Sequence, residues 1–112
     1  MNNRELDQKI YQIYSTIIDK FDIKDLIKYP DEDKVDCYNI PNFTTNIKWC
    51  FCLINILIEI YNIEICINYL RQTLPEKSKG WHCYIEDTHI FGEETPQLAF
   101  CQTFFKWSNN IP

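Results

Sequence analysis

The sequence of 112 residues contains little of what marks several classes of protein. It has two glycines and five prolines, too few for a collagen-like, low-complexity or disordered chain. It has 11 basic residues against 16 acidic ones, a net charge of −5, so it lacks the phosphate attraction that dominates nucleic-acid binding. What is present, 46% hydrophobic and 15% aromatic residues, is enough for one buried core. We therefore expect a single domain over residues 1–112.

The chain also lacks the long hydrophobic segments of secreted and membrane proteins. Its first ten residues, MNNRELDQKI, place acids and amides where a signal peptide would have a basic stretch followed by an apolar one. Residues 47–70 are largely apolar, but Lys48, Glu59, Glu64 and three asparagines interrupt them, and each is unfavourable in hydrocarbon. The sequence therefore predicts a cytoplasmic protein without a membrane span.

Two apolar patterns predict helices in the first half of the chain. Over residues 6–21 apolar side chains recur every three or four positions. Residues 22–43 form a long acidic surface connection, whose cluster at 31–36 lacks the spaced ligands and central glycine of a calcium loop. A second helix, residues 46–61, follows the capping hydroxyls of Thr44 and Thr45. It is apolar nearly all round, so it is either central to the core or meets a partner chain. Its one polar stripe contains Lys48, Cys52, Asn55, Glu59 and Asn62.

The second half of the chain has the two-residue period of strands. Strands are predicted over residues 63–70, 81–86 and 89–93, with Asp87 and Thr88 turning the chain between the last two. The short connections make them an antiparallel meander. Thr95 and Pro96 then begin a helix over residues 96–107. The predicted fold class is α+β, a layered sandwich in which a three-stranded antiparallel meander packs with about three helices, in the order α-α-β-β-β-α.

Four short segments fit one pattern together with this order of elements. They are Glu5-Leu6-Asp7, Ile40-Pro41-Asn42-Phe43-Thr44-Thr45-Asn46, Trp81-His82 and Gly92-Glu93-Glu94-Thr95-Pro96-Gln97-Leu98-Ala99-Phe100-Cys101. The pattern resembles the phage ABA sandwich domain family of bacteriophages and bacteria, including cyanobacteria. The resemblance covers most of the chain in element order and is sharpest in the carboxy-terminal third. It implies a compact layered α/β fold, and since that family has no established activity, it supplies no functional residues. The long acidic connection and the bulky Phe100, Phe104 and Phe105 depart from the family pattern and leave the helix packing open.

The cysteines are candidate ligands or nucleophiles, but none forms a C-x-x-C pair. Cys50 and Cys52 point about 200° apart on a helix, so they do not readily bind one ion. Four cysteines fall at core-like positions: Cys50, Cys66, Cys83 and Cys101. We predict buried free thiols, with a metal site or a disulfide as alternatives.

The two histidines lie on neighbouring predicted strands. His82 and His89 can approach each other, or Glu86 and Asp87, on one face of the sheet. A general base or a metal site needs a nucleophile or a third ligand, and the sequence supplies no motif for either. We therefore predict solvent-facing histidines and assign no catalytic, cofactor-binding or metal-binding residue.

The excess of bulky aromatic residues is the remaining functional signal. Aromatic side chains dominate the centres of protein interfaces, although packing within the core explains them equally well. The possible interface residues are Trp49, Phe51, Phe100, Phe104 and Trp107. The predicted function is a non-enzymatic interaction or accessory protein without a cofactor. We expect it to form a homodimer, or to bind a protein partner, through the helix over 46–61 or the helix over 96–107.

Two other functions stay open. A small enzyme or ligand-binding domain would need a polar pocket near His82, His89, Glu86 and Asp87. The order helix, three strands, helix is also similar to the double-stranded-RNA-binding domain, which grips phosphates with lysines at the start of its last helix. Here that position holds Thr95-Pro96-Gln97-Leu98, so nucleic-acid binding is not expected.

Overall fold

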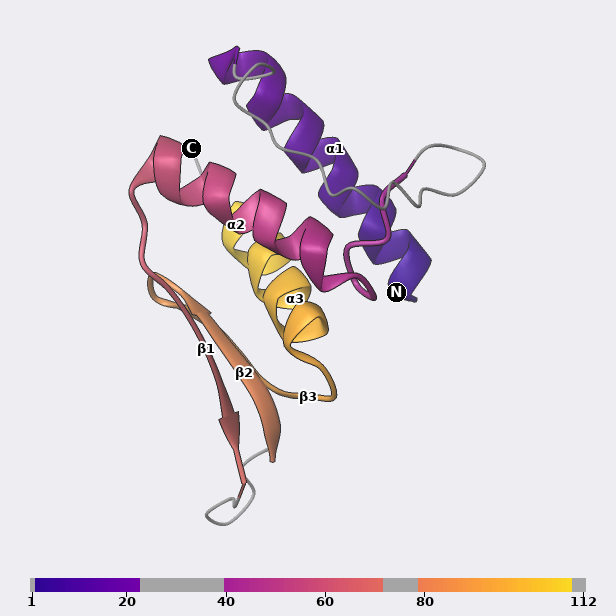
Figure 1. Ribbon diagram of the computed structural model, residues 1–112, viewed down its shortest axis with the longest axis vertical. Coiled ribbons are helices and arrows are strands. Elements are labelled where there is room, and N and C mark those ends of the chain that lie inside the picture. The colour runs from indigo at the N-terminus through magenta and orange to yellow at the C-terminus, as the bar shows by residue number, and fades with distance from the viewer. Residues whose placement is uncertain (1, 23–39, 72–78, 110–112) are drawn as a thin grey trace.

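The computed structural model describes residues 2–22, 40–71 and 79–109. Their elements follow the order predicted from the sequence (Figure 1). The helices are α1 (Asn3–Phe21), α2 (Ile47–Tyr61) and α3 (Pro96–Ser108), and the strands are β1 (Ile65–Leu70), β2 (Gly80–Ile85) and β3 (Thr88–Glu93). The predicted α+β class is confirmed. Most of the acidic connection predicted over 22–43, with its cluster at 31–36, lies outside the described residues.

The helices begin at polar side chains that accept backbone hydrogen bonds. Thr95 caps α3 as predicted, because its hydroxyl accepts the N–H of Leu98 at 3.1 Å. The cap of α2 is Asn46 and not Thr44 or Thr45, because the two threonines lie in a turn that precedes the helix. The prediction of a helix start was therefore right to within one or two residues and wrong about the capping side chain.

The three strands form one antiparallel sheet in the order β1-β2-β3. β1 and β2 pair without interruption over six residue pairs. Glu86 and Asp87 form the two-residue turn between β2 and β3, one residue earlier than predicted. Glu86 is left-handed there, with φ 51°. This turn holds β3 directly against β2, so residues near it come together across the two strands.

A bulge in β3 adds one residue to that strand. Phe91 and Gly92 together lie opposite the single residue His82, and Gly92 has φ 83°. At the start of β2, Gly80 has φ 126°, and a Cβ atom there would lie 2.7 Å from the carbonyl oxygen of Glu93. Both glycines are therefore required by the backbone of this end of the sheet.

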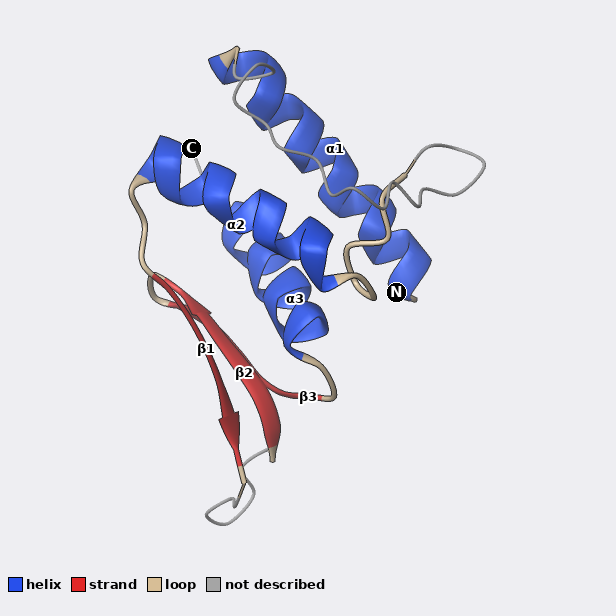
Figure 2. Cartoon of the chain, viewed as in Figure 1, coloured by secondary structure: helices blue, strands red, loops and turns tan. Residues whose placement is uncertain are grey.

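The central helix is α3. It packs against the sheet on one side, and its other sides contact α1 and α2 (Figure 2). Its fully buried residues are Ala99, Phe100, Cys101, Thr103 and Phe104. The sequence predicted that the helix over 46–61 is either central to the core or in contact with a partner chain. In the structure the central helix is α3 and not α2. The outward stripe of α2 includes Phe51 and Ile58, whereas Cys52, predicted on that stripe, is buried.

Candidate functional site

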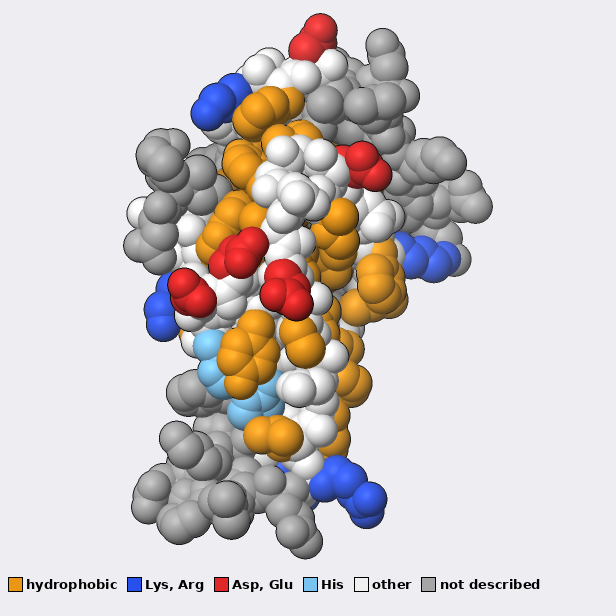
Figure 3. All heavy atoms as spheres, turned by 90° about the vertical axis from the view of Figure 1, so that its left-hand side faces the viewer, with side chains coloured by type: hydrophobic (Ala, Val, Ile, Leu, Met, Phe, Trp, Pro, Cys, Tyr) orange, Lys and Arg blue, Asp and Glu red, His pale blue; other side chains and the backbone are white. Residues whose placement is uncertain are grey.

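The two histidines lie on the face of the sheet that is turned away from α3. Cys83 and Ile85 on β2 are buried on the α3 side, so the alternating His82 and Tyr84 point to the other side. His89 on β3 is directly opposite Tyr84 and shares its face. Figure 3 shows the two histidines side by side on this face, with a hydrophobic side chain next to them and acidic side chains grouped above. The sheet therefore brings together the residues that the sequence placed on neighbouring strands.

The three rings of this group are in direct contact. Nδ1 of His82 and Nε2 of His89 are 3.2 Å apart, so one ring donates a hydrogen bond and the other accepts it. The ring of Tyr84 stacks on His89, with centroids 3.8 Å apart and planes 13° apart. His89 is thus held from two sides, by stacking and by a hydrogen bond. We call His82, Tyr84 and His89 the histidine cluster.

The prediction of solvent-facing histidines is wrong for His82, whose exposed fraction is 4%. Its position explains the burial, because it lies in the middle strand and opposite the bulge of β3, with His89 against its ring. His89 itself is half-buried. This partly buried, hydrogen-bonded pair of imidazoles can therefore stabilise the sheet as well as form a candidate site.

The two carboxylates predicted near the histidines are not part of the cluster. Glu86 and Asp87 form the exposed turn at the end of β2. The carboxylate of Glu86 accepts the N–H of Glu64 at 3.2 Å and so binds the chain just before β1. Within the described residues, no group of three or more His, Cys, Asp or Glu side chains is placed to hold a metal ion. The histidine cluster therefore consists of two imidazoles and a phenol, and Glu86 and Asp87 lie in the turn beyond it.

Most of the predicted interface residues belong to the core of the chain itself. Trp49, Phe100 and Phe104 are buried, so they are not available to a partner. Trp107 is half-buried, and its ring lies 5.5 Å from that of Tyr61. Only Phe51, with an exposed fraction of 55%, is open to solvent. The prediction is therefore wrong for Trp49, Phe100 and Phe104, which pack inside the core.

The cysteines of the described residues are free thiols, and all except Cys66 are buried. Cys66 was predicted at a core-like position but lies on the outer face of β1. Burial raises the pKa of Cys83 to about 12. Burial, together with the neighbouring Cys50 at a sulfur–sulfur distance of 3.8 Å, raises the pKa of Cys101 well above its ordinary value. These thiols are uncharged at neutral pH, which makes them poor nucleophiles and poor metal ligands.

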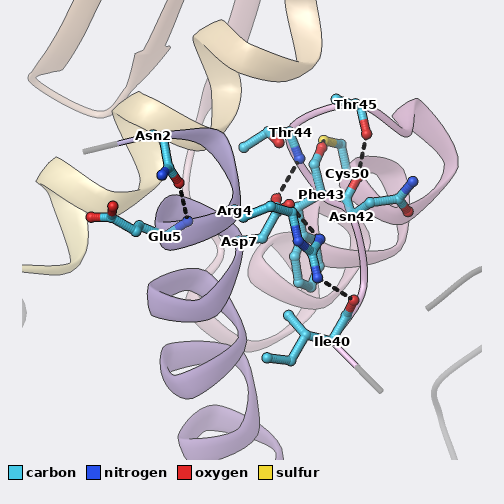
Figure 4. A network of polar contacts seen from close by, with 10 residues as sticks. All are labelled: Asn2, Arg4, Glu5, Asp7, Ile40, Asn42, Phe43, Thr44, Thr45 and Cys50. Atoms are coloured by element: carbon cyan, nitrogen blue, oxygen red, sulfur yellow. Dashed lines mark hydrogen bonds and ion pairs between the residues drawn. The ribbon is translucent and has the colours of Figure 1, made fainter. Parts of the chain in front are cut away.

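One buried charged residue, Asp7 on α1, was not predicted from the sequence (Figure 4). Its carboxylate accepts the N–H of Thr44 at 2.8 Å and pairs with Arg4 at 2.7 Å, and Arg4 also donates to the carbonyl of Ile40. The available signal was its place on the apolar side of the helix, three residues before the buried Ile10. The contacts join α1 to the segment that leads into α2, so Asp7 has a structural role.

None of the described helices is long and apolar enough to cross a bilayer. In comparisons with known proteins, no family model, no curated protein and no solved structure matches this chain.

Proposed function

We propose that this protein is a non-enzymatic interaction domain that associates with itself through its sheet. The observation that carries the proposal is that, among the described residues, α3 packs on one face of the sheet and no helix packs on the other. Six large hydrophobic side chains are exposed in the described part of the chain, and three of them, Tyr69, Leu70 and Tyr84, are on β1 and β2. Leu70 and Tyr84 lie on the open face, whereas Tyr69, opposite Trp81, lies on the α3 face at the free edge. Exposed apolar residues on a sheet that is covered on one face are typical of interaction surfaces.

The helices are weaker candidates for the association surface. α3 is buried between the sheet and the other helices. α2 exposes Phe51 and Ile58, but Lys48, Asn55 and Glu59 are also exposed along that helix. This polar surrounding favours the sheet over α2 as the contact.

The test is the mass of the purified protein in solution, measured by light scattering over a roughly hundredfold range of concentration. A mass that rises toward about 27 kDa, twice the 13.5 kDa of the chain, is expected. A constant mass of 13.5 kDa would contradict self-association.

We also propose that the chain is related to the phage ABA sandwich domain proteins and is cytoplasmic. The order of the six elements and the start of α3 at Thr95 and Pro96 support the relationship. The free thiols of Cys50 and Cys101, close to each other and not joined, support a reducing compartment. An experimental structure of a member of that family, superimposed on this fold, tests the first proposal, and localisation of the tagged protein tests the second.

The histidine cluster supports a second candidate, a small ligand site, because the 3.2 Å contact places two imidazoles where one ion or polar group can reach both. The probe is Zn²⁺ alone, followed by ¹⁵N spectra of the two rings. A ligand site predicts saturable shifts of both imidazoles, and in His89→Gln the shift of the remaining His82 ring should vanish. Unchanged spectra at about millimolar Zn²⁺ would exclude a zinc site.

A further inference from the structure

β1 is an edge strand without the features that usually protect an edge. Within Ile65–Leu70 there is no charged side chain and no proline, and the pairing with β2 has no bulge. In the described part of the chain no strand pairs with its outer side. Natural sheets normally block such edges, because free backbone groups pair with further strands. The opposite edge, β3, does have a bulge, at Phe91 and Gly92. The contrast makes β1 the edge that is open to pairing.

The hydrogen-bond pattern shows which backbone groups of β1 point outward. The N–H of Glu86 donates to the carbonyl of Glu64 at 3.0 Å, just before the strand begins. In an antiparallel ladder hydrogen-bonded pairs alternate with non-bonded ones, so even-numbered residues of β1 bond to β2. The odd-numbered residues, Ile65, Ile67 and Tyr69, therefore direct their N–H and C=O groups to the free edge.

We propose that two copies of this chain pair antiparallel through β1, about a two-fold axis at Ile67. In this register each of the three residues with outward backbone groups lies opposite such a residue of the second copy, so all of these groups can form hydrogen bonds. Residues that lie opposite each other also share a face of the sheet. Ile65 then lies opposite Tyr69 of the second copy, and Ile67 lies opposite its own counterpart. The result is a six-stranded sheet, β3-β2-β1-β1-β2-β3, with both copies of α3 on the same face. This inference names the partner and the contact for the self-association proposed above, and it rests on that proposal.

The side chains of β1 suit this register. Tyr69 has an exposed fraction of 44%, and its ring already packs edge-on against Trp81, with centroids 5.3 Å apart. Beside Ile65 of the second copy it forms an aromatic and β-branched pair, which is a favourable pair across strands. The pairing therefore covers an exposed ring without moving it from its present neighbour.

The charges at the two ends of β1 have opposite signs. Glu64 precedes the strand and Arg71 follows it, and both are exposed. In the proposed register Glu64 lies opposite Leu70 of the second copy, and Arg71 follows that residue on the other face of the sheet, so one charge of each sign flanks the contact at each end. Two chains of net charge −5 repel each other, so a strand without charged side chains, flanked by one charge of each sign, is the favourable approach.

A disulfide between the copies tests the register directly. The proposed pairing places Cys66 opposite Asn68 of the second copy as a non-hydrogen-bonded pair, with Cα atoms about 4.5 Å apart. That spacing suits a disulfide between the two copies. A disulfide between positions 66 and 68 of the same chain is excluded, because residues two apart on one strand have Cβ atoms about 6.6 Å apart, which is too far. The variant is Asn68→Cys in a Cys37→Ser background, oxidised with copper phenanthroline. We expect most of the protein to run as a dimer on a non-reducing gel and to return to monomer with a thiol.

The matched control replaces Cys66 as well. The variant that combines Asn68→Cys with Cys66→Ser should give no covalent dimer. Position 68 then lies opposite position 66 of the second copy, where the substitution has removed the thiol. A strong covalent dimer in this control would mean that position 68 faces itself, which overturns the proposed register.

A second measurement separates this inference from the proposed function. Tyr69→Lys places a charge on the edge at an exposed position, and we expect it to weaken the dimer at least tenfold in light scattering while circular dichroism shows a folded chain. Phe51→Lys on α2 is the control and should keep the wild-type mass. A stable dimer that survives Tyr69→Lys and is lost in Phe51→Lys would overturn pairing through β1 but leave self-association in place. A wild-type chain that is monomeric throughout, and gives no covalent dimer, would overturn both.

Discussion

The carboxylate of Asp7 accepts the backbone N–H of Thr44 at 2.8 Å, across 37 residues of sequence. Both groups are buried, and the contact is made in the first two turns of α1. Arg4, one turn earlier, compensates the charge. The segment that leads into α2 is therefore fixed to α1 by a charged hydrogen bond inside the fold.

Replacing Asp7 should destabilise the protein in two distinct steps. Asp7→Ala leaves the buried N–H of Thr44 without its acceptor and should lower the free energy of unfolding by about 2–4 kcal/mol. Asp7→Asn keeps an acceptor but loses the charge opposite Arg4, and we expect about 1–2 kcal/mol. Urea unfolding followed by tryptophan fluorescence measures both. Equal losses for the two variants would show that the hydrogen bond to Thr44 contributes nothing.

Gly80 is the second position where a single atom should matter. With φ 126° and a Cβ position 2.7 Å from the carbonyl oxygen of Glu93, Gly80→Ala strains the start of β2 and pushes β3 away. We expect a loss of about 2–4 kcal/mol. Ala at the neighbouring Lys79, which is exposed, is the control and should cost less than about 0.5 kcal/mol. Thermal melting of the two variants gives the comparison.

The buried thiol of Cys83 should make the protein less stable at high pH. Burial raises its pKa to about 12 from an ordinary 9.0. Between these values the unfolded chain has lost the thiol proton and the folded chain has kept it, so the free energy of unfolding falls by about 1.4 kcal/mol for each pH unit. Urea unfolding at about pH 10 and about pH 11 measures the slope, to which the buried Cys101 adds in the same direction.

The control for that experiment is Cys83→Ala, whose stability should fall less steeply with pH even though its absolute stability is lower. Identical slopes for this variant and the wild type would contradict the assignment to Cys83.

The parts of the fold that local sequence determines were predictable. The three- and four-residue spacing of α1 and the capping Thr95 of α3 are formed by neighbouring residues, and they are found in place. Cys66 was misplaced for a related reason: it alternates with Ile65 and Ile67, whose side chains take the α3 face and leave Cys66 outside. Reading the alternation strictly would have placed it correctly.

Features that join distant segments were not predictable. The bulge at Phe91 and Gly92 depends on how β3 meets β2, and the hydrogen bond from Thr44 to Asp7 depends on how α1 lies against a segment far along the chain. For the histidine cluster, the short turn indicated that His82 and His89 are close, but the burial of His82 follows from the middle position of β2 and from the bulge. Periodicity carries no information about such contacts.

The hydrogen bond between His82 and His89 should contribute to stability, and a double-mutant cycle measures by how much. His82→Leu and His89→Leu each remove one partner of the 3.2 Å contact, and the double variant removes both. Since the pair is largely shielded from water, we expect the two single losses to exceed the double loss by about 0.5–1.5 kcal/mol. Tyr84→Leu paired with His82→Leu is the matched cycle and should give a smaller coupling, because Tyr84 stacks on His89 and not on His82. A coupling near zero between the histidines would contradict a stabilising hydrogen bond within this pair.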